Sequence, residues 1–175
     1  MAENPAPFET YGGDTAVDVD DLGAGPGGFA VGGNRTTGAA AWFSADGVAF
    51  TLVEDAPGLA GATVARDAVA LPDGRWMIVG GRGDRAAAWV GPAFTPADPP
   101  AGTGFAEVQR AVRLGDDVVA AGMRGTSFGL WRWQAGTWTA GTTFGGDPGG
   151  VRSMSVVAGH TVVVGGGLWQ TRLRG

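Results

Sequence analysis

The chain has 175 residues, a formal net charge of −5, no cysteine and 44% hydrophobic residues. This length and composition indicate a single folded domain and exclude a disordered chain, disulfide bonds and thiolate chemistry. An acidic chain without a basic tail is also not expected to bind nucleic acid, because phosphate contacts dominate that affinity.

The sequence contains no membrane span or leader signature. No apolar run reaches the roughly 18 residues that a membrane helix needs. The first residues lack the basic and apolar regions of a signal peptide. They fit a cytoplasmic start or a mature extracellular domain with a new initiator methionine, of which the second is favoured.

Glycine and proline together argue against helices. The chain holds 34 glycines and 10 prolines, and each glycine inside a helix costs about 1 kcal/mol relative to alanine. Short Val, Ala, Trp, Phe and Thr runs between these residues are instead typical of strands joined by tight turns.

The chain begins with a short segment that resembles the last strand of a later repeat. Pro7–Thr10 is similar to the segments around Phe50 and Phe94, and it precedes a first strand expected at Thr15–Val19. A turn that includes Asp20 and Asp21 and the glycine-rich run Gly23–Gly28 is expected to follow.

One unit then recurs four times along the chain. It consists of an apolar strand ending in a small-residue pair, a turn, an Ala- or Gly-rich strand with one tryptophan, and an aromatic residue usually followed by threonine. The marker tryptophans are Trp42, Trp89, Trp131 and Trp169, which are 47, 42 and 38 residues apart. This spacing is close to the period of about 40–50 residues of four-stranded propeller blades.

The sequence therefore predicts an all-β protein, a β-propeller with four four-stranded blades per chain. The blades are expected at residues 14–55, 62–98, 105–144 and 151–175 of a single domain, 1–175. The fourth blade lacks its last strand, so Pro7–Thr10 is expected to close it, within the same chain or in a second one, and to cover an unpaired sheet edge.

The segment from Trp42 to Phe50, Trp-Phe-Ser-Ala-Asp-Gly-Val-Ala-Phe, resembles the Asp-box of sialidase-like (BNR-type) propellers, in a form one residue shorter than usual. The resemblance covers one blade of four and implies a structural hairpin between the third and fourth strands. Sialidase activity is not expected, because the family's tyrosine nucleophile has Tyr11 as its only counterpart, in the closing segment.

No metal, cofactor or catalytic residue is predicted. His160 is the single histidine and has no second ligand or catalytic partner in view. The acidic residues Asp18, Asp20 and Asp21 lack the loop spacing of a calcium site and are interpreted as turn-capping groups.

Arginines are the candidate ligand-binding residues. The propeller resemblance implies that one face of the ring carries the turns between second and third strands and the entry to each blade. The turn arginines are Arg35, Arg82, Arg85 and Arg124, and the residues nearer the axis are Arg66, Asp67, Gln109, Arg110 and Arg152. The opposite face is expected to receive Asp20, Asp21, Asp46, Asp73, Asp116 and Asp117.

Three functions remain open at this point. A binding module would hold a glycan or an anionic ligand on the arginine face, because guanidinium groups match carboxylate and sulfate. A hydrolase or lyase would use Asp67 or Asp14 as a base, with Arg66 and Arg110 gripping the substrate. A structural half-ring would pair with a second copy into an eight-bladed homodimer, with a four-bladed monomer as the alternative.

The binding module is preferred because no base–nucleophile pair is visible, and the arginines could alternatively form only surface ion pairs. Trp133 and Trp138 break the repeat pattern and are expected to be exposed aromatic side chains.

Overall fold

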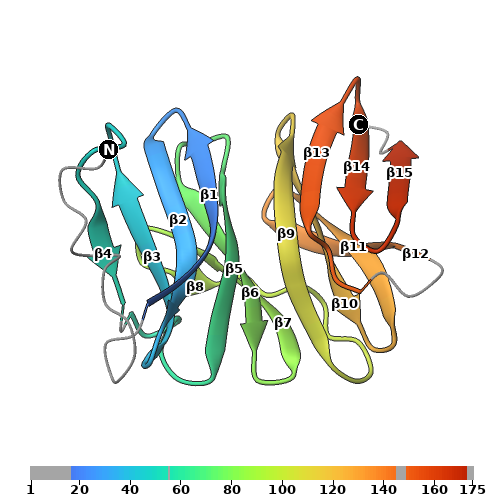
Figure 1. The fold of residues 1–175 in the computed structure, drawn as a ribbon, viewed down its shortest axis with the longest axis horizontal. Coiled ribbons are helices and arrows are strands. Elements are labelled where there is room, and N and C mark those ends of the chain that lie inside the picture. Colours follow the sequence, from blue (N-terminus) through green and yellow to red (C-terminus); the bar gives the residue numbers. More distant parts are fainter. Residues whose placement is uncertain (1–16, 55, 145–148, 173–175) are drawn as a thin grey trace.

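A computed structural model of the chain describes residues 17–54, 56–144 and 149–172. Over these ranges the protein is all-β, with no helix, and its four antiparallel sheets are arranged as four successive blades of a β-propeller (Figure 1). The predicted fold class is confirmed. Among the same residues there is no helix long and apolar enough to span a membrane.

Each sheet is built from strands that follow one another along the chain. The first sheet contains β1 (Val17–Gly25), β2 (Gly28–Arg35), β3 (Gly38–Ser44) and β4 (Thr51–Val53). The second contains β5 (Thr63–Ala70), β6 (Trp76–Arg82), β7 (Arg85–Val90) and β8 (Thr95–Pro96). The third contains β9 (Ala106–Leu114), β10 (Asp117–Arg124), β11 (Ser127–Gln134) and β12 (Thr137–Phe144). The fourth contains β13 (Ser153–Val157), β14 (His160–Val164) and β15 (Leu168–Arg172). The predicted closing strand, Pro7–Thr10, lies outside the described residues.

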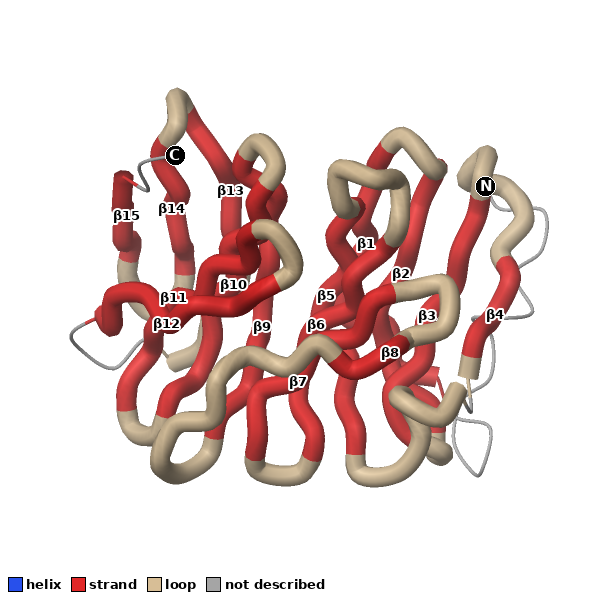
Figure 2. Tube along the Cα trace, turned by 180° about the vertical axis from the view of Figure 1, so that it is seen from behind, coloured by secondary structure: helices blue, strands red, loops and turns tan. Residues whose placement is uncertain are grey.

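The sheets fan out from their first strands. Strands β1, β5, β9 and β13 lie side by side along the axis and contact one another in chain order. The first sheet extends from the axis to one side and the fourth extends to the opposite side, with the other two sheets between them (Figures 1 and 2). The described sheets therefore form an arc, with β4 and β15 at its two ends.

Apolar layers between neighbouring sheets make up the core. We call the face of a sheet toward the next sheet its forward face, and the face toward the preceding sheet its rear face. Each marker tryptophan lies on the rear face of its sheet. Trp89 packs on the forward face of the first sheet, Trp131 on that of the second and Trp169 on that of the third. Because the second sheet is covered on both faces by its neighbours, an alanine-rich strand such as Ala86–Ala88 suffices to fill these thin layers.

A β-bulge recurs in the axial strand of the first three sheets. The bulged residues are Asp20, Arg66 and Gln109, and the pairing is regular again one residue later. A glycine stands opposite each bulge: Gly33, Gly80 and Gly122. A Cβ on Gly80 would lie 1.8 Å from the carbonyl oxygen of Val64, so the bulged backbone leaves no room for a side chain. Bulges re-aim side chains, and here they direct polar groups to the axis.

The first strand differs from the prediction. It does not end at Val19 but continues to Gly25, and the turn is confined to Pro26 and Gly27. Gly23 and Gly25 lie so close to the second sheet that a Cβ at either position would fall within 2.4 Å of one of its atoms. The glycine-rich run is therefore a strand that approaches its neighbour closely, and its prediction as a long turn was wrong.

Candidate axial site

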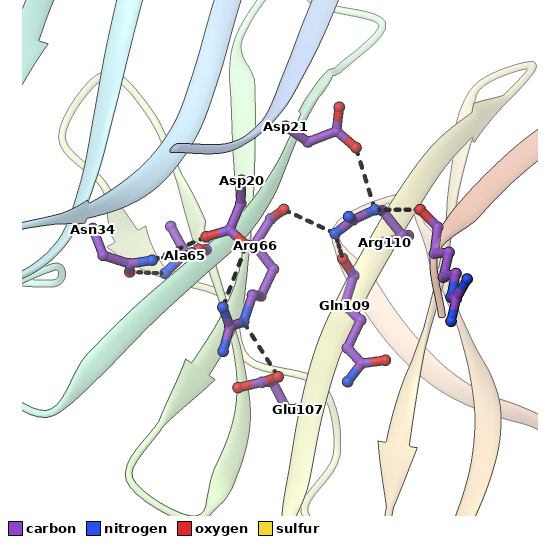
Figure 3. A network of polar contacts seen from close by, with 9 residues as sticks. Asp20, Asp21, Asn34, Ala65, Arg66, Glu107, Gln109 and Arg110 are labelled. Carbon is purple, nitrogen blue, oxygen red and sulfur yellow. Dashed lines mark hydrogen bonds and ion pairs between the residues drawn. The ribbon is translucent and has the colours of Figure 1, made fainter. Parts of the chain in front are cut away.

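A network of polar side chains connects all four sheets at the bulges (Figure 3). Asn34 of β2 exchanges hydrogen bonds with the backbone of Ala65 on β5, where its Oδ1 accepts from the amide nitrogen at 2.8 Å and its Nδ2 donates to the carbonyl oxygen at 3.2 Å. The Asn34 side-chain nitrogen, Nδ2, also donates a hydrogen bond to Asp20 Oδ2 at 3.0 Å. This side chain thus joins the first two sheets in the way that a strand backbone would.

Arg66 lies between two carboxylates from different sheets. Its Nη1 is 3.3 Å from Asp20 Oδ1, and its Nε is 3.3 Å from Glu107 Oε1. Burial opposes the charge of Arg66, but Glu107 and Asp20 outweigh it and raise the pKa of the guanidinium above its ordinary value. Burial raises the pKa of Asp20, although Arg66 lowers it.

Arg110 is the hub on the third sheet. Its Nε donates to the carbonyl oxygen of Arg152 at 3.1 Å, and its Nη1 donates to those of Gln109 and Arg66 at 2.6 and 3.3 Å. Asp21 Oδ2 lies 3.3 Å from Nε. A guanidinium group with five donors can make such contacts in several directions at once, so Arg110 links the first three sheets to the segment that leads into the fourth.

Asp67 is the most buried acid of the network, with 6% of its surface exposed. Its two oxygens accept hydrogen bonds from the amide nitrogens of Ala68 at 2.7 Å and Ala111 at 2.8 Å. Burial raises its pKa to about 7, with a further contribution from the Asp21 carboxylate, against the lowering effects of the two amides and Arg110.

A concavity of about 510 Å³ lies along the axis beside this network. It is lined by β1 from Asp21 to Gly25, by β5 from Asp67 to Ala70, by β9 from Arg110 to Arg113, and by the start of β13. Carboxylate, guanidinium and hydroxyl groups alternate there with small apolar side chains. A second hollow of about 300 Å³ shares Arg110 and is lined also by Arg66, Glu107, Gln109 and residues 149–152.

Five of the nine residues predicted for the site meet at the axis, and four do not. Arg66, Asp67, Gln109, Arg110 and Arg152 line one of the two hollows. Gln109 also accepts a hydrogen bond from the amide nitrogen of Val151 at 2.7 Å.

The turn arginines lie elsewhere, and three of them have structural partners. Arg35 pairs with Glu54 at 3.4 Å, and Arg82 pairs with Asp98 at 3.0 Å. Arg82 and Arg124 also lie over the rings of Trp89 and Trp131, 5.6 and 5.5 Å from their centroids. In each of these three blades the arginine precedes the marker tryptophan by seven residues. Arg85 is largely exposed, 4.0 Å from Asp84.

Two acidic residues were placed on the wrong face of the molecule by the sequence prediction. Asp20 and Asp21 lie inside β1 and pair with Arg66 and Arg110, because β1 continues past the bulge instead of turning. Sequence reasoning also missed Asn34, Glu107 and Arg113. Their position directly beside the small-residue pairs, or in the axial strands, was the available signal.

Trp138 was also predicted incorrectly. It is 7% exposed, its Nε1 donates to the carbonyl oxygen of Ala97 at 2.6 Å, and its ring meets Trp133 edge to face. The indole is buried because the connection after β8 passes over it.

No group of three or more His, Cys, Asp or Glu side chains that could hold a metal ion occurs among residues 17–54, 56–144 and 149–172. Comparison of the chain with family models, curated proteins and solved structures gives no match. Function must therefore be inferred from the chemistry of the site, since a propeller fold alone specifies none.

Proposed function

We propose that the protein is a non-catalytic binding module that holds a glycan, or another polyhydroxylated ligand with an acidic group, in the axial concavity. The observation that carries this proposal is that all four sheets contribute to one hollow of about 510 Å³ with both hydrogen-bond donors and acceptors. Ligands bind preferentially in concave sites with a few convergent polar groups.

The charge balance of the hollow favours a ligand with hydroxyl groups over a simple anion. Arg66 and Arg110 are already paired with Asp20, Glu107 and Asp21. Arg113 is different, because its Nε donates a hydrogen bond to the carbonyl oxygen of Gly115 at 2.7 Å and it forms no ion pair with a carboxylate among the described residues. Its remaining donors are suited to a carboxylate or sulfate at the end of the concavity.

An array of neutral, carboxylated and sulfated oligosaccharides tests this function. We expect binding of an acidic glycan, and at least tenfold weaker binding by Arg113→Ala because a charge-assisted hydrogen bond is lost. Arg85→Ala removes another exposed arginine, which lies away from the axis, and serves as the matched control. Absence of binding across the array, or equal loss in both variants, would contradict the proposal.

The hydrolase or lyase alternative is less well supported. Asp67 is buried, and its two oxygens already accept hydrogen bonds from two backbone amides. It therefore suits a structural role better than that of a catalytic base. The other candidate base, Asp14, lies outside the described residues.

A second candidate function is that of a half-ring whose role is assembly. It is favoured by apolar side chains exposed at the two ends of the arc, among them Leu22 on the first sheet and Leu168 on the fourth, 56% and 72% exposed. Large exposed apolar groups that cluster are typical of protein interfaces.

We also propose that residues 44–49 form an Asp-box-like hairpin with a structural role. Asp46 Oδ1 accepts hydrogen bonds from the amide nitrogens of Val48 and Ala49 at 2.9 and 3.2 Å, and Ser44 Oγ accepts one from that of Gly47 at 2.9 Å. The Val48 and Ala49 amides and the Ser44 hydroxyl lower the pKa of Asp46. Asp46→Ala should lower the melting temperature and leave glycan binding unchanged.

A further inference from the structure

Because the blades repeat one pattern, a position in one sheet has an equivalent position in the other sheets. The marker tryptophans pair with Val31, Ile78, Ala120 and Val163 on the second strand of their own sheet. Counting from these pairs, Val164 of the fourth sheet corresponds to Val79 of the second, and Val19 of the first sheet corresponds to Ala65 of the second. Equivalent positions can therefore be compared for exposure.

The forward face of the fourth sheet exposes positions that are buried in the sheets before it. Val157, Val164 and Leu168 are 59%, 40% and 72% exposed. Their equivalents in the second sheet are Leu71, Val79 and Ala88, which are 3%, 0% and 0% exposed. The difference arises because the third sheet covers the forward face of the second. At these three positions the fourth sheet carries apolar side chains, as a covered face does, and it has no described sheet in front of it.

The rear face of the first sheet shows the complementary pattern. Val19 and Leu22 are 48% and 56% exposed, whereas their equivalents in the second sheet, Ala65 and Ala68, are 0% and 3% exposed. Trp42 lies on this same face and is fully buried with Val31 and Ala40, so the exposed apolar side chains of this face belong to its axial strand, β1. Together the two end faces hold five of the six large hydrophobic side chains that are exposed among the described residues.

We propose that the forward face of the fourth sheet packs on the rear face of the first sheet of a second copy, so that two chains close into an eight-bladed ring. These faces are the two halves of the interface that repeats three times within one chain, so every copy carries both complementary surfaces. End repeats of a repeat protein normally need polar outer faces to stay soluble, whereas both end faces here expose large apolar side chains.

The shape of the arc sets the number of copies at two. Because the first and fourth sheets extend in opposite directions (Figure 1), a second arc related by a two-fold axis places both pairs of end faces together at once. The pairing needs no further chain and leaves no end face uncovered.

Ring closure would also complete the axial concavity. The hollow is bounded at one end of the arc by Leu22 and at the other by Ser153 and Met154. In the ring these two borders would each meet the partner's opposite border, and the hollows of the two copies would line one channel. The pairing builds on the second candidate function and does not depend on the ligand.

Light scattering coupled to size-exclusion chromatography tests the proposal directly. We expect the wild-type chain to elute with twice the mass of the 17.6 kDa chain. Val164→Arg and Val19→Glu should each give a monomer, because each places a charge in an apolar interface on one of the two faces. Phe105→Glu is the matched control, because Phe105 is the sixth exposed large hydrophobic, at 47%, and lies on neither end face. It should leave the dimer intact.

A mixture of Val164→Arg and Val19→Glu chains distinguishes this pairing from any other. Position 164 of one chain then faces position 19 of the other at one junction, and the second junction is wild type. We therefore expect dimers to return in the mixture and not in either variant alone, and circular dichroism melting curves should show that each variant is folded.

Each outcome decides a different point. A wild-type monomer, or a mass of more than two chains, overturns the eight-bladed ring, and a wild-type monomer also overturns the assembly function. A dimer that survives Val164→Arg, or a mixture without rescue, keeps assembly as a function but overturns this pairing of faces. Glycan binding by the wild-type protein is measured separately and is unaffected by these results.

Discussion

The second and fourth sheets share one sequence pattern but differ in what surrounds them. The second sheet has a neighbour on both sides, and its core strand Trp76–Val79 is at most 8% exposed. The fourth sheet has a described neighbour only behind it, so Val163 is fully buried while Val164, the next residue, is 40% exposed. The apolar face of a propeller blade is thus buried only where a neighbouring blade packs against it.

The largest effect is expected from a substitution at the bulge, which the second sheet has and the described strands of the fourth sheet lack. Gly80→Ala would place a Cβ 1.8 Å from the Val64 carbonyl oxygen, so we expect a loss of about 3 kcal/mol or more in the free energy of unfolding. Gly102→Ala, where a Cβ meets no atom within 4 Å, should change it by less than about 0.5 kcal/mol. Urea denaturation measures both, and equal effects would contradict the packing described for the bulge.

Two identical truncations compare the sheets at one equivalent position. Val79→Ala should cost about 2–3 kcal/mol, because Val79 is fully buried. Val164→Ala should cost less than about 0.5 kcal/mol when measured at protein concentrations low enough to keep the chain monomeric. If the two costs are equal in urea denaturation of the monomer, the fourth sheet is covered and the contrast between the sheets is wrong.

Asp67 of the second sheet corresponds to the exposed Ser153 of the fourth, and its burial has a pH signature. Its pKa is about 7 in the folded protein and 3.8 when unperturbed, so folding takes up a proton between these values. Its contribution to stability is therefore fully present below about pH 4 and is lost as the pH rises toward 7.

Asp67→Asn should remove this pH dependence and cost about 1–2 kcal/mol at pH 5, because one backbone amide loses its acceptor. Melting temperatures of the wild type and the variant from pH 4 to 8 give the difference. Because other carboxylates titrate in both proteins, only the difference between the two curves is diagnostic. Parallel curves would contradict the raised pKa of Asp67.

The smallest expected effect concerns the arginine stacked on the marker tryptophan. Arg82 lies over Trp89 and pairs with Asp98, whereas the corresponding turn of the fourth sheet, Gly165–Gly167, has no arginine. Arg82→Ala should cost about 1 kcal/mol. Arg85→Ala, in the same turn and largely exposed, should be neutral within error in the same thermal melts.

The sequence was sufficient to predict the fold because its signals are local. Glycine-bounded strands and a tryptophan once per blade specify the four repeats without knowledge of their neighbours. The length of β1 was not predictable in this way, because Gly23 and Gly25 resemble turn residues and their role is set by the approach of the second sheet.

The candidate site was predictable only in part for the same reason. Repeat register brought Arg66 and Arg110 to the axis, but their carboxylate partners come from strands whose ends were misplaced. The stacking of Arg82 and Arg124 on tryptophans requires each arginine side chain to reach along its own sheet to the ring on the neighbouring strand. Seven-residue spacing between the arginine and the tryptophan in three blades was a signal that could have revealed it.

The distribution of the marker tryptophans also gives the protein built-in optical reporters. Trp89 and Trp131 lie in the layers behind the second and third sheets, at 0% and 1% exposure. Indole emission shifts to longer wavelength when water reaches the ring, so chains that keep one of these tryptophans and carry phenylalanine at the others would report the opening of a single layer. Whether neighbouring blades separate together or one after another during unfolding could then be followed by fluorescence without any added dye.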